Sequence, residues 1–324
     1  MDASFWRYAH AAAYSARINT KSIKQTSGIQ NLDSQQYLDE RVGFPPLAEQ
    51  TRIAAFLDRE TAKIDGLVAE QQRLIDLLKE KRQAVISLAV TKGLNPAAPM
   101  KPSGIEWLGD VPAHWTVNKL GRAVFMQEGP GLRTWQFTDE GTRVICVTNI
   151  TENGIDFSLL QKFISTEEYN SSYHHFTVNS GDVLLSSSGN SWGKVAIYNG
   201  EEAVILNTST IRLNESKGVP LTRDFIALIL QSVSVREQLE LAMTGSCQPN
   251  FGPSHLNRLM VAIPERAEQV LIVVVTKKKF EALNVLITEA QRAIDLLHER
   301  RTALISAAVT GQIDVRHLAE AGAA

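Results

Sequence analysis

The chain has 324 residues, of which 44% are hydrophobic and 21% are charged, and its formal net charge is −2. These values are ordinary for a soluble globular protein, and the length leaves room for two or three modules. The longest purely apolar run, Val270–Val275, is far shorter than a membrane span, and the N-terminus lacks the pattern of a signal peptide. Only two cysteines occur, without metal-site spacing, so we expect a cytoplasmic protein without membrane association.

Residues 1–44 read as the end of a globular domain. At a constant offset of 219 they align with residues 220–263, although few positions are identical. Asn31 then matches Asn250, and Val42 matches Val261. We therefore expect 1–44 to be the C-terminal remnant of a domain whose complete version occurs once in this chain.

Residues 45–93 are predicted to form one long amphipathic helix. Apolar residues recur at alternating spacings of three and four from Ile53 to Leu88, interrupted by Glu60, Gln71 and Lys81. This is a heptad pattern, and the interruptions favour a specified register over a generic apolar seam. Gly93 follows the last periodic residue, where helices often end.

Residues 94–106 begin with a Pro/Ala-rich stretch and are interpreted as a linker. Residues 107–263 contain short strand-like runs cut by turn residues, followed by helical periodicity over 221–243. We expect a complete mixed globular domain here, and the fold class of the whole chain to be α+β.

Residues 264–324 repeat the long helix and add a tail. Residues 264–310 align with 45–91 without gaps, and 21 of the 47 pairs are identical. Because both apolar stripes have the same phase, we expect an antiparallel coiled coil, although each helix could instead pack on a nearby globular domain. The predicted interface residues are Ile64, Leu67, Leu74, Leu78, Val85, Leu283, Leu286, Leu297 and Leu304.

Catalytic motifs are missing from the sequence. Residues 189–195 contain a Gly-Lys pair but lack the spacing of a nucleotide-binding loop. We find no zinc-protease, nucleophile-elbow, glycine-rich cofactor or methyltransferase pattern. We therefore expect no catalytic residue, no metal and no cofactor, and interpret the chain as a recognition protein.

Several segments, in their order along the chain, resemble type I restriction–modification specificity subunits. Residues 103–115 look like the start of a target-recognition domain, residues 181–196 and 206–213 are similar to its strand–loop–strand, and residues 45–50 are similar to the beginning of the family's spacer helix. The resemblance covers essentially the whole chain, and the duplication makes it more specific than any single motif.

The resemblance implies two recognition domains, each reading half of a bipartite double-stranded DNA sequence, held apart by two antiparallel helices. It also implies methyltransferase (modification) subunits and a restriction–translocase subunit as partners. This chain departs from the pattern because only residues 1–44 match the first recognition domain. We therefore expect an N-terminally truncated subunit, whose single copy reads one half-site and whose dimer restores two recognition domains. A coiled-coil interaction scaffold and a non-functional remnant of a split gene are the alternatives.

The candidate DNA-binding residues lie on loops of the central domain, because base reading needs hydrogen-bonding groups that reach base edges. For each polar one the alternative is an ordinary turn or capping role, and for Trp135 and Trp192 it is packing at the edge of the core. Residues 107–263 carry 11 Lys/Arg and 15 Asp/Glu, so we expect partner subunits to supply most phosphate contacts. The candidates are Arg133, Thr134, Trp135, Ser187, Ser188, Asn190, Ser191, Lys194, Asn207, Thr208, Gln248 and Asn250.

Overall fold

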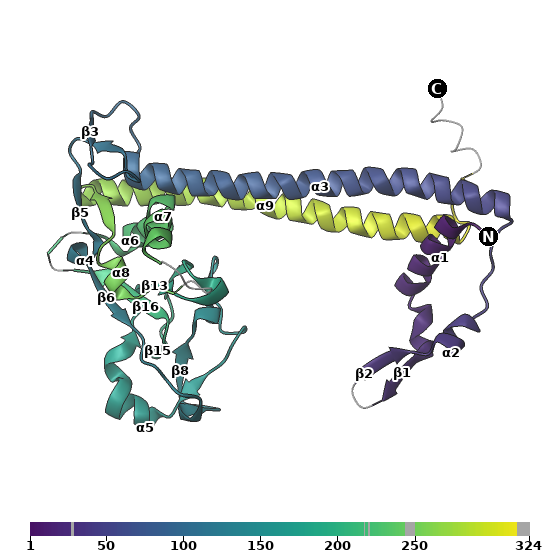
Figure 1. Cartoon of the computed structure of the whole chain (residues 1–324), viewed down its shortest axis with the longest axis horizontal. Coiled ribbons are helices and arrows are strands. Elements are labelled where there is room, and N and C mark those ends of the chain that lie inside the picture. The colour runs from purple at the N-terminus through teal and green to yellow at the C-terminus, as the bar shows by residue number, and fades with distance from the viewer. Residues whose placement is uncertain (27–28, 217, 220, 244–249, 316–324) are drawn as a thin grey trace. The chain divides into compact units, whose positions relative to one another are not determined.

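The structure is a computed structural model that describes residues 1–26, 29–216, 218–219, 221–243 and 250–315. The chain divides into two compact units. Unit 1 comprises Met1–Leu78 and Asn284–Ala324, and unit 2 comprises Lys79–Leu283. Two long helices, α3 (Leu47–Lys92) and α9 (Arg266–Val309), each contribute residues to both units (Figure 1). The predicted α+β class is confirmed.

Unit 1 contains a small N-terminal segment packed on the first half of α3. Its core joins Phe5 and Tyr8 to Ile53 and Leu57 of α3, and to Ile305 of α9. The start of α3 thus meets the end of α9, so the two helices run antiparallel here. The segment's elements are α1 (Ala3–Ser15), the 3-10 helix η1 (Ile18–Ser22), the antiparallel strands β1 (Ile23–Thr26) and β2 (Ile29–Leu32), and α2 (Ser34–Leu38).

The beginning of each long helix is anchored by an equivalent glutamine. Gln50 donates from Nε2 to the carbonyl of Pro45, and its Oε1 accepts from the backbone amide of Asp2, the N-cap of α1. Gln269 is related to Gln50 by the repeat offset, and it donates to the carbonyl of Pro264 in the same way. Both glutamines are buried, so these bonds fix each helix to the segment that precedes it.

The buried seam of the two helices follows a heptad alternation, but not in the predicted phase. Leu67, Leu74 and Leu286 are 45%, 42% and 52% exposed, so the prediction that they lie in the interface is corrected. Ile75 packs instead against Ala290 and Ile294, with Val68 and Ile287 beside them. The buried and half-buried positions are Leu57, Thr61, Ile64, Val68, Gln71, Ile75 and Leu78 in α3, and Thr276, Phe280, Leu283, Ile287, Ala290, Ile294, Leu297 and Arg301 in α9.

The error has a local cause. Leu67 precedes Val68, and Leu74 precedes Ile75, so an apolar stripe can be drawn through either member of each pair. The two stripes differ only in whether the spacing of four precedes or follows the spacing of three. Residues Ile64, Leu78 and Leu283 belong to both stripes and are buried, whereas Val85, Leu297 and Leu304 are half-buried. Phe280 is the residue that separates the alternatives, because the rejected stripe would place Lys279 in the seam.

Unit 2 is built on two sheets. The first is antiparallel throughout, in the order β14 (Val195–Ile197), β13 (Val183–Ser186), β16 (Thr210–Glu215) and β6 (Val124–Glu128). The second has the order β12 (Thr177–Val178), β15 (Val204–Leu206), β8 (Thr142–Ile145), β11 (Phe163–Ile164) and β7 (Phe137–Thr138), with β15 and β8 parallel.

Three strand pairs and a set of shorter helices complete unit 2. The pairs are β3 (Met100–Pro102) with β4 (Asp110–Pro112), β5 (Thr116–Lys119) with β17 (Met260–Ile263), and β9 (Ile150–Thr151) with β10 (Gly154–Ile155). The α-helices are α4 (Leu120–Ala123), α5 (Thr166–Glu168), α6 (Arg223–Leu230), α7 (Val233–Ala242) and α8 (Pro253–Leu256). Single turns of 3-10 or π helix are η2 (Thr134–Gln136), η3 (Val147–Asn149), η4 (Tyr169–Tyr173), η5 (His174–Phe176) and η6 (Gly189–Ser191).

The core of unit 2 joins the first sheet, α6 and the ends of the long helices that belong to this unit. Trp115 is fully buried, and its indole donates to Oε2 of Glu268 in α9 at 2.9 Å. Its ring also lies where a Cβ on Gly93 would come within 3.2 Å. This contact fixes the end of α3 and the start of α9 to the same globular domain.

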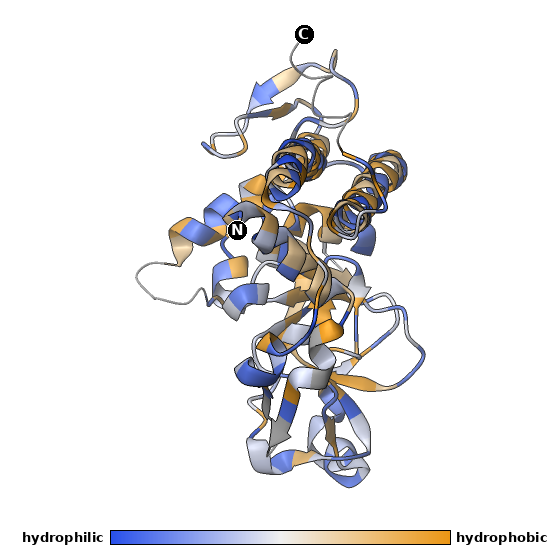
Figure 2. Cartoon of the chain, turned by 90° about the vertical axis from the view of Figure 1, so that its right-hand side faces the viewer, coloured by the Kyte–Doolittle hydropathy of each residue, from blue (hydrophilic) through white to orange (hydrophobic). Residues whose placement is uncertain are grey.

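Viewed nearly end-on in Figure 2, each long helix carries both hydrophilic and hydrophobic residues. Within the described part of the chain, none of the helices combines the length and apolarity that crossing a membrane requires.

Candidate nucleic-acid interface

The antiparallel first sheet brings three predicted loops to one edge. Ser186 at the end of β13 pairs with Thr210 at the start of β16, and Glu128 at the end of β6 pairs with Ile211. Leu185 pairs with Val195 at the start of β14. The segments 129–136, 187–194 and 207–209 therefore all leave the sheet at the same end of its strands. We call this end the loop edge.

A fourth segment joins the loop edge after α7. Ser188 forms an isolated antiparallel bridge with Asn250, and the amide of Phe251 donates to the carbonyl of Ser187 at 3.1 Å. Trp192 packs edge-on against Phe251, with ring centroids 6.4 Å apart. Gln248, the other candidate in this segment, lies outside the described residues.

Loop 129–136 approaches the neighbouring turn closely. The amide of Gly129 donates to the carbonyl of Thr210 at 2.9 Å, and a Cβ on Gly129 would meet the carbonyl oxygen of Asn207 at 2.1 Å. Only glycine fits there without moving one of the two backbones. Further along, Leu132 is buried beside Cys146 and Ile205, which holds the loop against the second sheet.

The tip of this loop carries an exposed aromatic residue. Trp135 is 80% exposed, so the alternative that it packs at the edge of the core does not hold. Its neighbours Arg133 and Thr134 are also exposed. Gln136 holds the end of the loop in place, because it is buried and its Nε2 donates to the hydroxyl of Tyr173 at 2.9 Å. A braced loop that presents an indole and a guanidinium to solvent is suited to contact a ligand.

Two candidates are corrected because hydrogen bonds within the fold hold their side chains. Ser187 is fully buried, and both its amide and its hydroxyl donate to the carbonyl of Ser209, at 2.9 and 3.0 Å. Ser209 adopts φ 61°, uncommon for a residue other than glycine, and the double hydrogen bond supports that conformation. Asn207 turns inward and donates to the sulfur of Cys146 at 3.4 Å. These side chains shape the loop edge and do not face a ligand.

The remaining candidates face outward or are partly accessible. Asn190, Thr208 and Asn250 are exposed, and Ser188, Ser191 and Lys194 are half-buried. No ion pair within 4 Å is found for Arg133 or Lys194 among the described residues. The loop edge thus presents amide, hydroxyl, indole and cationic groups that the fold does not use.

Two other cations of the domain are already paired. Arg212 reaches the fully buried carboxylate of Asp182 at 3.5 Å and donates to Oε1 of Gln127. Arg143 pairs with Glu202 at 3.2 Å and lies over the rings of Phe157 and Phe163. Arg212 and Arg143 therefore serve the fold, whereas Arg133 and Lys194 at the loop edge have no ion pair among the described residues.

Neither a reactive thiol nor a metal-binding cluster is found among the described residues of the domain. Burial raises the pKa of the Cys146 thiol above its ordinary value, so this thiol is poorly suited to act as a nucleophile. Within the described ranges, no group of three or more His, Cys, Asp and Glu side chains is arranged to hold a metal ion.

A cationic cleft beside the loop edge was missed by the sequence analysis. It is lined by Lys79 and Arg82 of α3 together with Lys194 and Arg236 of the globular domain. In the sequence, Lys79 and Arg82 read as ordinary polar positions of an amphipathic helix. Their proximity to a loop more than 100 residues away depends on the tertiary fold, so no local pattern could have revealed it.

Comparisons with known proteins agree with this architecture. Residues 112–293 match the family model described as the type I restriction modification DNA specificity domain. The chain is 23% identical over 302 residues to the type I restriction enzyme MjaVIII specificity subunit of Methanocaldococcus jannaschii, covering 92% of this chain and 68% of that protein. It is 23% identical over 314 residues to the EcoBI specificity subunit of Escherichia coli, covering 95% of this chain and 65% of that protein.

Solved structures show the same fold. A chain from a study of complex assembly and conformational transition of the type I R-M system superposes with a TM-score of 0.71 and 16% identity, covering 95% of this chain and 71% of that chain. The HsdS subunit from Thermoanaerobacter tengcongensis gives a TM-score of 0.50 at 16% identity, covering 97% and 71%. The chain spans about two thirds of the length of the curated relatives it matches. Because the family model covers more than half of its residues, the chain belongs to the family of type I restriction modification DNA specificity domains.

Proposed function

We propose that this chain reads one half-site of a double-stranded DNA target through its loop edge, as the non-catalytic specificity subunit of a type I restriction–modification complex. The observation that supports this best is the convergence of four segments whose outward side chains are not used by the fold. Methylation and cleavage would belong to partner modification and restriction subunits.

The chemistry of the loop edge suits base reading. A guanidinium such as that of Arg133 can donate two hydrogen bonds to a guanine in the major groove, and amides such as Asn190 and Asn250 can pair with adenine. Lys194 is a compact cation suited to a phosphate, which carries no sequence information. Since the domain has more acidic than basic residues, partner subunits would supply much of the phosphate contact.

Docking of the modification subunit is proposed to use the outer face of the helix pair in unit 1. Apolar residues that point away from the buried seam remain exposed there, and contiguous exposed apolar surface commonly marks a protein interface. Two pairs of these positions, Leu67 with Leu286 and Leu77 with Leu296, are related by the repeat offset. The exposed residues are Leu67, Leu74, Leu77, Val285, Leu286 and Leu296.

The decisive experiment measures sequence-dependent DNA binding by the chain assembled with its modification subunit. Arg133→Ala, or Ser188→Ala with Asn190→Ala, should weaken binding to one half-site by about 1–3 kcal/mol per lost bidentate contact. Lys194→Ala should weaken binding to all DNA sequences by a similar factor, and it should lower the slope of log K against log salt by about one unit. Arg258→Ala is the matched control, because Arg258 is exposed but adjoins Asn257, which packs on Gly121 before β6 rather than at the loop edge.

Two outcomes would contradict the proposal. Unchanged discrimination between target and altered half-sites after all three loop-edge changes would move the reading surface elsewhere. The second outcome combines two results. If the double variant Leu67→Glu with Leu286→Glu no longer bound the partner, and no assembly showed sequence-dependent DNA binding, an interaction scaffold would be favoured. In the assembled complex, two copies of the chain would give an interrupted palindrome as the target, because equal recognition domains read equal half-sites.

A further inference from the structure

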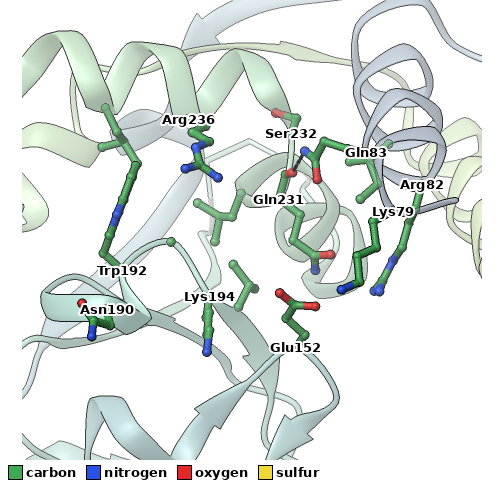
Figure 3. A pocket seen from close by; sticks show the side chains of 15 residues that line it. Lys79, Arg82, Gln83, Glu152, Asn190, Trp192, Lys194, Gln231, Ser232 and Arg236 are labelled. Atoms are coloured by element: carbon green, nitrogen blue, oxygen red, sulfur yellow. Dashed lines mark hydrogen bonds between the residues drawn. The ribbon is translucent and has the colours of Figure 1, made fainter. Parts of the chain in front are cut away.

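The cleft beside the loop edge has a volume of about 390 Å³ and lies wholly within unit 2. Figure 3 shows Lys79 and Arg82 extending from α3 on one side, and Asn190, Trp192 and Lys194 on the other. Arg236 of α7 points into the same region, and Glu152 is the one acidic residue among the lining side chains. The lining therefore has four cations and one carboxylate.

The walls of the cleft are held in fixed positions. Gln83 of α3 donates from Nε2 to the carbonyl of Gln231 between α6 and α7. One turn further along α3, the Ser87 hydroxyl accepts from the amide of Val233 at 3.0 Å. Ile86 is buried between these two contacts. Because the helix is bonded to the globular domain, Lys79 and Arg82 keep a constant relation to Lys194.

The cations of the cleft are only partly neutralised. Arg236 pairs with Glu240 at 2.9 Å, in an exposed contact that contributes little, and its guanidinium lies 5.0 Å from the centre of the Trp192 ring. Arg82 lies over the ring of Phe280 at 4.9 Å, which positions its guanidinium without neutralising it. No carboxylate lies within 4 Å of the Lys79 or Lys194 ammonium in the part of the chain that the structure describes. With Glu152 and Glu240 both counted, the site keeps a formal charge of about +2.

The internal repeat shows that this charge is specific to one copy. Arg301 is related to Arg82 by the repeat offset, and its guanidinium donates to Oδ1 of Asp65 at 2.9 Å. The position related to Asp65 is Asn284, an amide of similar size. Lys79 likewise corresponds to His298. Arg82, which faces the complete globular domain, has no corresponding ion pair among the described residues.

We propose that this cleft binds a backbone phosphate of the DNA. The phosphate would belong to the strand that passes along loop 187–194, just beyond the half-site that this loop contacts. The proposal rests on the proposed function, and it assigns to α3 a direct DNA contact. Asn190 and Lys194 belong both to the reading loop and to the cleft, so one strand passing along the loop would bring its next phosphates toward Lys79 and Arg82. Planar guanidinium groups bind phosphate oxygens with two parallel hydrogen bonds.

A free nucleotide fits the cleft less well than a phosphodiester. The Trp192 ring, the one aromatic side chain in the lining, is already covered by Arg236 and packs against Phe251. One face of this ring is therefore already occupied by a cation and is not free to stack on a base. An acidic segment of a partner protein would satisfy the same charges and is the competing outcome of the test below.

The test uses the chain assembled with its modification subunit and a DNA duplex that contains the target. Lys79→Gln with Arg82→Gln should weaken binding to target and non-target duplexes by the same factor, and lower the slope of log K against log salt by about one to two units. Arg82→Lys should keep most of the slope because it keeps the charge. Lys81→Gln is the matched control, since Lys81 is exposed on the same helical turn and does not line the cleft.

Each result decides the question. An unchanged salt slope in the double variant, with Lys81→Gln also unchanged, overturns the proposal. A loss confined to one base sequence would make these residues base readers, and reduced recovery of the modification subunit with unchanged DNA affinity would identify an acidic protein segment as the occupant. If neither the parent chain nor any variant discriminates between DNA sequences, the proposed function fails. The salt dependence of binding to non-target duplex still tests the phosphate site in that case. Helical ellipticity and the melting temperature of the variants exclude a folding defect.

Discussion

The phase of the helix seam predicts a large difference between two adjacent substitutions. Ile75 is 4% exposed and packs against Ala290 and Ile294, whereas Leu74 is 42% exposed. Truncating a buried isoleucine to alanine costs about 2–5 kcal/mol, the cost rising with the cavity that remains. Only two helices form this seam, so the cavity can partly close. We therefore expect Ile75→Ala to lower the free energy of unfolding by about 2–3 kcal/mol. Leu74→Ala should cost less than about 1 kcal/mol, as for a largely solvated side chain.

The assay compares urea unfolding of the full chain by helical ellipticity with amide hydrogen exchange over residues 68–78. Exchange is needed because a chain with two units need not unfold in one transition. Ile75→Ala should lower protection across this part of α3, and Leu74→Ala should leave it near the parent value. Ile294→Ala and Leu286→Ala form the equivalent pair in α9. If Leu74→Ala were as costly as Ile75→Ala, the seam would have the other phase and the packing described above would be refuted.

Three further changes test the globular domain. Asp182→Ala should destabilise unit 2 by about 3–5 kcal/mol in chemical denaturation, because it leaves the largely buried Arg212 without its carboxylate; a loss below about 1 kcal/mol would contradict this account. Gly129→Ala should displace loop 129–136 from the turn at Asn207 and reduce discrimination between half-sites, since its Cβ would meet a carbonyl oxygen at 2.1 Å. In a Cys247→Ser background, the Cys146 thiol should react slowly with an alkylating reagent at pH 8 and rapidly after unfolding, because burial raises its pKa and depletes the thiolate; equal rates would show that it is accessible.

The long helices could be predicted because their signals are local. A periodic apolar pattern without internal proline, followed by glycine, depends on neighbouring residues alone, and α3 (Leu47–Lys92) lies within the predicted range 45–93. It was harder to predict which side of the helix faces its partner helix, because Leu74 and Ile75 are adjacent and both apolar. The choice between them depends on the opposite helix, where Phe280 rather than Lys279 enters the seam.

The candidate site was predictable as a set of loops, but not residue by residue. Short strands separated by turns imply antiparallel neighbours, so loops that are distant in sequence can meet at one sheet edge. Ser187 and Asn207 look like their exposed neighbours in sequence. Their hydrogen bonds to Ser209 and Cys146 span 22 and 61 residues, so they form only when distant segments come together in the folded domain. Trp135 is the converse case, because an indole whose type alone would also allow packing at the core is held in solvent by a loop anchored at Leu132.

A repeat within one chain helps to separate structural from functional residues, because both copies must solve the same packing problem. Gln50 and Gln269 make the same bond to a preceding proline carbonyl, which is what a structural requirement produces. Positions that differ between the copies are free of that requirement. Arg301 pairs with Asp65, whereas the related Arg82 lines the cleft and has no ion pair in the described part of the chain. The unpaired arginine is therefore a difference between the copies that packing does not require. The variant that combines Lys79→Gln with Arg82→Gln tests whether this difference serves DNA binding, because a lowered slope of log K against log salt would show a function and an unchanged slope would assign the difference to drift.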